Sequence, residues 1–266
     1  MDILIHTLSG TATAALISTF TKAKTKTKLS LILLGGFAGA LPDIDAISLW
    51  SGFDSTIGKW LHLKHTGMEI YFGKFWYSHH GFFHSLLAAA LLAAVFICLR
   101  KLFFKEESWK KYISMPQTKW ILLLFFCSYV SHLIGDLPTP AAAWGGVRLF
   151  FPFEVYIGGF GTTWWWNNYD VFLSLLTATI LLVILTLIEG NIFQKDYVRM
   201  SVLIYVCCVS FCTYFVTHRS ISYAYEGNTL RYAFYERTSK MDQYSRLRKP
   251  LFKIMTTFDN KLPVYF

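Results

Sequence analysis

The chain has 266 residues, of which 54% are hydrophobic, 18% aromatic and only 15% charged, and its mean hydropathy is +0.41. About a quarter of the residues of a soluble globular domain are charged, so this composition excludes an ordinary soluble protein and indicates a membrane protein. The formal net charge is +9. No zinc-finger, RRM or basic-helix pattern accompanies that charge, so no nucleic-acid partner is expected.

Six apolar stretches run through the chain, and a membrane-spanning helix needs about 20 mostly apolar residues. They cover residues 3–20, 29–41, 82–99, 120–135, 171–188 and 201–216. The second and fourth are the shortest, and each leads to a proline, Pro42 or Pro138, where a non-helical segment is expected. The predicted fold is all-α, a polytopic integral membrane helix bundle with about six transmembrane helices.

Basic residues gather in the loops after the first, third and fifth of these stretches. Because each membrane crossing reverses the side, these three loops lie on the same side of the membrane. The basic residues are Lys22, Lys24, Lys26 and Lys28 in the first loop, Arg100, Lys101, Lys105, Lys110 and Lys111 in the second, and Lys195 and Arg199 in the third. The positive-inside rule makes this side cytoplasmic. We therefore expect a multi-pass protein of the cytoplasmic (inner) membrane with its amino terminus outside.

Ionisable residues from four separate segments fall on the opposite side of the membrane. They are His6 in the first stretch, Asp43 and Asp45 after the second, His79 and His84 around the start of the third, and His132 and Asp136 at the end of the fourth. Parity alone brings them to one face of the bundle, however the helices pack. Ionisable residues in or near membrane helices are costly and mark functional sites.

The spacings within this set are compatible with a common site. His132 and Asp136 are four residues apart and share one helix face. Asp43 and Asp45 are two residues apart, and in the extended backbone expected after Pro42 they would face the same way.

A turn at Gly81 would let His79 and His84 reach a common point. His80 is expected to face elsewhere. His62 and His65 lie in a loop with lysines and aromatic residues and are interpreted as surface residues.

Imidazole and carboxylate ligands suit Zn, Mn or Fe, and a ligand set without cysteine argues against a structural thiolate zinc site. The candidate ligands are His6, Asp43, Asp45, His79, His84, His132 and Asp136, more than one tetrahedral ion uses. The sequence therefore predicts one or two divalent ions, and a pair would lie about 3.5–4 Å apart.

Three regions follow from this pattern. Residues 1–155 are predicted to form a metal-binding helical membrane core, and residues 156–217 two further transmembrane helices. Residues 218–266 form a basic, aromatic tail, in which alternating aromatics such as Tyr223 and Tyr225 suggest a small β-structure. The five cysteines all lie in apolar segments and predict no disulfide framework.

Several separated motifs resemble the YdjM-like family of membrane-bound metal-dependent hydrolases. They are Asp2, His6 and Gly10 in a D-x-x-x-H-x-x-x-G pattern, Pro42-Asp43-Ile44-Asp45, His79-His80-Gly81-Phe82-Phe83-His84-Ser85, Ser131-His132-Leu133-Ile134-Gly135-Asp136, Thr139-Pro140 and Phe151-Pro152-Phe153. The resemblance covers roughly the first 155 residues and implies metal-dependent hydrolysis. Two positions depart from the pattern, because His80 replaces an arginine and Phe83 a threonine.

These observations predict a membrane-embedded metal-dependent hydrolase that uses metal-activated water on the extracytoplasmic face. Asp45 is the candidate general base, and Arg148 is the candidate clamp for an anionic substrate oxygen. The expected partners are membrane lipids and a small or lipid-linked anionic substrate, a phosphate or an ester. The oligomeric state stays open.

Two other functions fit the same residues. Intramembrane carboxylates and histidines also mark ion pathways, so a metal or proton transporter is an alternative. Against it, the cluster lies near one end of the bundle, and no matching polar set lines the cytoplasmic half. The other alternative is a non-catalytic scaffold whose metal ion only staples helices together, which a closed coordination shell would favour.

Overall fold

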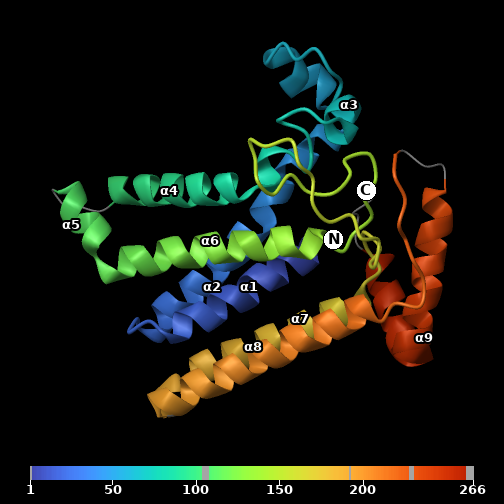
Figure 1. Ribbon diagram of the computed structural model, residues 1–266. Coiled ribbons are helices and arrows are strands. Elements are labelled where there is room, and N and C mark those ends of the chain that lie inside the picture. The colour runs from blue at the N-terminus through green and yellow to red at the C-terminus, as the bar shows by residue number, and fades with distance from the viewer. Residues whose placement is uncertain (1, 104–107, 192, 228–230, 262–266) are drawn as a thin grey trace.

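A computed structural model describes residues 2–103, 108–191, 193–227 and 231–261 (Figure 1). The named elements of these residues are all helices, joined by irregular segments, with no named strand and three isolated β-bridges. Lys105, of the second basic loop, lies outside the described residues. The predicted all-α membrane architecture is confirmed at this level.

Six helices correspond to the six apolar stretches and run alongside one another (Figure 1). They are α1 (Ile3–Thr19), α2 (Thr25–Ala40), α4 (Leu86–Leu102), α6 (Pro116–Asp136), α7 (Tyr169–Leu187) and α8 (Gln194–Thr217). The α1–α2 and α7–α8 connections and the short helix α5 (Trp109–Ser114) lie at one end of the bundle. The amino terminus, α3 (Gly67–Phe72) and α9 (Tyr232–Asp259) lie at the other.

Four segments are long and apolar enough to cross a membrane: Thr25–Leu49, Pro116–Asp136, Tyr169–Leu187 and Gln194–Thr217. Ile3–Thr19 is a shorter apolar helix, and its 17 residues span about 26 Å at about 1.5 Å per residue. Helix α4 also has 17 residues. The protein is thus a membrane protein with four clear candidate spans, and the predicted number of six stays a prediction.

Helices α1 and α2 touch through glycines. A Cβ atom on Gly10 would lie 2.3 Å from the carbonyl oxygen of Gly35, and one on Gly39 would lie 2.6 Å from that of His6. Gly35 and Gly39 form a G-x-x-x-G spacing, which permits close backbone approach between membrane helices. This contact fixes the depth of His6 relative to the end of α2.

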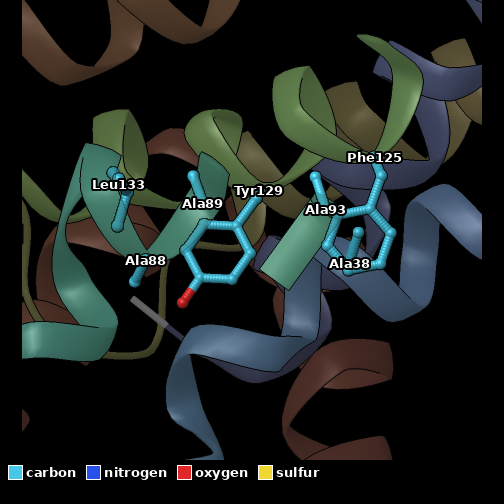
Figure 2. Close-up of a cluster of buried hydrophobic side chains, with 7 residues drawn as sticks. All are labelled: Ala38, Ala88, Ala89, Ala93, Phe125, Tyr129 and Leu133. Atoms are coloured by element: carbon cyan, nitrogen blue, oxygen red, sulfur yellow. The ribbon is translucent and has the colours of Figure 1, made fainter. Parts of the chain in front are cut away.

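Alanines let α4 lie close to α6 in a similar way. The cluster of buried side chains in Figure 2 consists of Ala38, Ala88, Ala89, Ala93, Phe125, Tyr129 and Leu133. The Tyr129 hydroxyl donates to the carbonyl oxygen of Phe83 at 2.5 Å. That bond holds the 3₁₀ turn η3 (Phe82–His84), and therefore His84, against α6.

The segment after α2 differs from the prediction. Residues 41–49 form the 3₁₀ helix η1 (Leu41–Leu49), with Pro42 in its first turn, so Asp43 and Asp45 do not lie in extended backbone. Proline is well tolerated in a first helical turn, which explains why the chain stays helical here. The rest of this connection contains the π-helical turn η2 (Asp54–Gly58), and η4 (Glu189–Asn191) connects α7 to α8.

The tail does not form the predicted β-structure. Its described part contains the helix α9, with a kink at Arg248, and its pairing is limited to the isolated bridge of Glu226 with Ala142. The aromatics of α9 pack as helical neighbours, with Tyr232 and Tyr235 both against Trp164.

A buried ion network ties the tail to the bundle. Arg219 donates to both carboxylate oxygens of Asp170 at 2.7 and 2.9 Å and lies 3.3 Å from Asp242 on α9. All three side chains are at most 3% exposed. The network therefore anchors α9 at the amino-terminal end of α7.

Candidate metal centre

The structure brings the seven predicted ligands together at one end of the bundle. Each helix delivers its residues where the sequence predicted, with His6 on α1, Asp43 and Asp45 on η1, His79 before η3, His84 on η3, and His132 and Asp136 on α6. Buried groups of three potential ligands each are His6, His132 and Asp136; Asp43, His84 and His132; and His79, His80 and His84. Buried histidines and aspartates at this position could hold a metal ion.

Four of these side chains converge most closely, and His132 lies at their centre. Its Nε2 atom is 3.5 Å from Asp43 Oδ1, 3.3 Å from His84 Nε2 and 3.0 Å from Asp136 Oδ2. His84 Nε2 is also 3.6 Å from both Asp43 Oδ1 and Asp136 Oδ2. Ligands of a tetrahedral zinc site, with bonds of about 2.0–2.1 Å, lie about 3.3–3.4 Å apart, so this spacing fits one ion.

His6, on α1, contacts two members of this set. Its Nε2 atom lies 3.1 Å from the second oxygen of Asp136, and its ring stacks on His132 with centroids 3.6 Å apart. His132 belongs to two of the three groups and His84 to two. Because one imidazole nitrogen binds one ion, the three groups cannot all be filled at once.

Hydrogen bonds behind the rings orient the nitrogens that face inward. His132 donates through Nδ1 to the carbonyl oxygen of Gly39 at 2.7 Å, which leaves Nε2 as the ligand atom. Asp45 lies behind two rings, with its oxygens 2.6 Å from His79 Nδ1 and 3.3 Å from His84 Nδ1. Asp45 thus holds two histidines, and the direct metal contact predicted for it from the sequence stays a prediction.

Several buried atoms of the cluster make no hydrogen bond. His6 Nε2, His84 Nδ1 and Asp45 Oδ2 are such atoms, although each lies within 3.3 Å of an opposing group. Two carboxylates flank the His84 ring, with Asp45 Oδ2 3.3 Å from Nδ1 and Asp43 Oδ1 3.6 Å from Nε2. They stabilise a positive charge at this position, either a proton on the ring or a metal cation in its place.

His80 is part of the site, contrary to the sequence prediction. Its backbone is left-handed, with φ of 62°, which turns its ring to the same side as its neighbours. His80 Nδ1 donates to the carbonyl oxygen of Gly146 at 2.9 Å, and burial holds its pKa well below 6.5. Its Nε2 atom is therefore available as a neutral ligand. Nothing in the sequence pattern indicates this turn.

The side chain of Arg148, the predicted clamp for an anionic substrate oxygen, is engaged within its own loop. Its guanidinium donates to the carbonyl oxygens of Phe153 and Pro152 at 2.9 and 2.8 Å and lies over the ring of Phe151. We therefore assign Arg148 to holding this loop. His62 is exposed and His65 stacks on Phe75, so both stay outside the cluster as predicted.

A cavity of about 1190 Å³ opens onto the cluster, and Asp43, His79, His80 and Asp136 form part of its wall. Aromatic side chains supply much of the rest, including Tyr71, Trp144 and Trp165. Strained backbone is concentrated here, because His80, Ala142 and Asn167 all line the cavity with positive φ. Non-glycine residues in this conformation are typical of functional sites.

The family described as YdjM inner membrane protein matches residues 1–219. No curated protein and no solved structure matches the chain. The matched segment contains the whole histidine and aspartate cluster and helices α1 to α8, and it ends before α9. The chain therefore belongs to the YdjM inner membrane protein family.

Proposed function

We propose that the protein is a membrane-embedded hydrolase that depends on one divalent metal ion, with Asp43, His84, His132 and Asp136 as its ligands. The observation that carries this proposal is the cavity, which opens onto the cluster at Asp43 and Asp136. A purely structural site has no use for such access. A divalent ion there would supply a more acidic water and polarise a phosphoryl or ester oxygen.

The side chains around the ion have separate roles in this proposal. His79 lines the cavity and hydrogen-bonds through Nδ1 to Asp45, so its other nitrogen can accept a proton from the attacking water. Tyr71 stacks on the His79 ring with centroids 4.5 Å apart and an angle of 10°. Asp45 and Tyr71 thus hold His79 in one orientation, as the orienting carboxylate does in a hydrolytic triad.

The substrate class follows from the position of the cavity. It lies at the bundle end where α1 begins, and apolar side chains such as Ile3, Leu4 and Met68 line it beside the polar cluster. Leu4 and Met68 are also exposed on the outer surface. This combination supports a lipid or lipid-linked phosphate or ester, entering with its polar group toward the cluster.

A structural metal site is the second candidate, and one observation favours it. Asp43, His84, His132 and Asp136 approach closely enough to close a tetrahedral shell with protein atoms alone. In that case the ion would stabilise the helix ends and do no chemistry.

Hydrolysis of a panel of phospholipids and lipid-linked diphosphates by the purified full chain separates the two candidates. We expect release of a water-soluble product by the wild type, loss of release in Asp43→Ala, and normal release in the surface variant His62→Ala. Retained metal and stability with no product from any lipid of the panel would contradict the hydrolase and support the structural site.

A further inference from the structure

The cavity wall away from the metal cluster is built largely by the tail. Tyr232, Glu236, Lys240 and Asp259 of α9 line the cavity, together with Trp166 and Asn167 from the loop before α7. Figure 1 shows α9 beside the bundle end that holds the amino terminus. The family match ends at residue 219, so α9 lies outside the matched segment.

This wall carries an excess of negative charge. Three carboxylates line it, those of Asp2, Glu236 and Asp259, whereas Lys240 is the single basic side chain among the described lining residues. Lys240 pairs with Glu236 at 2.8 Å. Asp259 accepts a hydrogen bond from Tyr169. Burial raises the pKa of Asp259, and the Asp2 carboxylate raises it further, so a cation beside Asp259 would be stabilised.

Two aromatic rings of this wall stand beside Glu236. Trp166 and Tyr232 lie with centroids 5.2 Å apart and their planes at 59°, so they form adjoining walls and not a closed stack. The indole N–H of Trp166 donates to Glu236 at 2.5 Å, which fixes the ring. Aromatic faces combined with carboxylates are the usual recognition site for an ammonium group.

Asn167 supplies an independent indication of a ligand. Its side-chain amide nitrogen is buried without a hydrogen-bond partner, although the residue is only 6% exposed and lines the cavity. Its backbone is also left-handed, with φ of 61°. Buried donors in native proteins are nearly always satisfied, so this N–H is placed to donate to an acceptor oxygen of a bound molecule.

We propose that the cavity binds the headgroup of a zwitterionic phospholipid, with its ammonium group between Trp166, Tyr232 and Asp259 and with Asn167 donating to one of its oxygens. This inference rests on the proposed function in one respect, because the phosphate then faces the metal cluster. A phosphoethanolamine or phosphocholine headgroup has both required groups. The sequence-based expectation of an anionic substrate is thereby narrowed to one that also carries a positive charge.

Calorimetric binding to the metal-loaded full chain tests this directly. The probes are phosphoethanolamine, phosphocholine and glycerol 3-phosphate, which has the phosphate without the ammonium. We expect the two ammonium compounds to bind at least about tenfold more tightly than glycerol 3-phosphate. The relative affinity for phosphoethanolamine and phosphocholine shows whether the cavity prefers a primary or a quaternary ammonium group. Equal binding of all three by the wild type overturns the proposal.

Variants of the cavity wall test which residues cause the preference for ammonium compounds. Asp259→Asn and, independently, Tyr232→Leu should remove most of the tenfold advantage while the metal content stays unchanged. Asp196→Asn is the matched control, because Asp196 is an exposed carboxylate at the start of α8. A preference that survives in both cavity variants contradicts the assignment. A wild type that shows the preference but hydrolyses no lipid would refute the proposed hydrolase and leave this subsite standing.

Discussion

At the scale of single residues, the cluster separates side chains that face an ion from side chains that hold them. His132 Nε2 lies within 3.0–3.5 Å of three other ligand atoms, whereas Asp45 contacts the outward nitrogens of His79 and His84. The sequence does not reveal this difference, because Asp43 and Asp45 lie two residues apart in the same segment and look equivalent. In the 3₁₀ helix η1 they diverge and lie on different sides of His84.

Asp45→Asn tests this assignment. An amide in place of the carboxylate keeps the size of the side chain but weakens its hold on the His79 ring. We expect metal content close to that of the wild type and turnover reduced about 10- to 100-fold, the usual cost of losing an orienting partner. Metal analysis and lipid hydrolysis on the same preparation measure both quantities. Loss of the metal in Asp45→Asn would instead make Asp45 a ligand.

At the scale of elements, glycine contacts between α1 and α2 set the geometry of the site. In Gly39→Ala the new methyl group would meet the backbone of His6, so α1 must move away from α2. Overpacking of this kind costs about 1–3 kcal/mol. We expect a lower midpoint of thermal unfolding and weaker metal binding, since His6 and the Gly39 carbonyl both serve the cluster. Gly190→Ala is the control, because nothing lies within 4 Å of the added carbon; equal midpoints for the two variants would contradict the packing argument.

The ion network at the base of α9 makes a separate prediction. Arg219→Ala leaves Asp170 buried without its main partner and removes one of the two arginine partners of Asp242, and breaking a buried pair costs about 3–5 kcal/mol. We expect α9 to detach, so that limited proteolysis cuts within residues 231–261 much faster than in the wild type. Arg199→Ala removes an exposed arginine from a surface pair worth about 0–1 kcal/mol and should change nothing. Cleavage of both variants at the wild-type rate would argue against this anchor.

At the scale of the whole molecule, parity was sufficient to place the cluster. Helices that alternate in direction must bring the end of α2, the start of α4 and the end of α6 together, and the seven predicted residues do lie close to one another in the structure. The orientation of His80, the loop contacts of Arg148 and the docking of α9 depend on tertiary hydrogen bonds and on backbone conformations that leave no periodic pattern in the sequence. The alternating aromatics of the tail suggested strands, but Tyr223 and Tyr225 lie in irregular backbone, and Tyr232 and Tyr235 lie in helix α9 and pack on Trp164.

Membrane orientation is the molecular property that the basic loops predict. In a cysteine-free background, Lys22→Cys should react with a membrane-impermeant thiol reagent only after permeabilisation, because its loop is expected to be cytoplasmic. Glu154→Cys lies at the opposite end, where the side chain is 93% exposed, and should react in intact cells. The reverse pattern would invert the orientation and place the cavity on the cytoplasmic side.

The buried histidines and aspartates are proposed to form one metal centre, and elemental analysis of the purified chain is the decisive experiment. Protein prepared without chelator should contain about one divalent ion per chain, His132→Ala should lose nearly all of it, and His62→Ala should keep it. His132 is the decisive position because its Nε2 atom lies nearest to the other ligands. Metal below about a tenth of an ion per wild-type chain, or the same metal content in His132→Ala as in the wild type, would show that these residues form no metal centre.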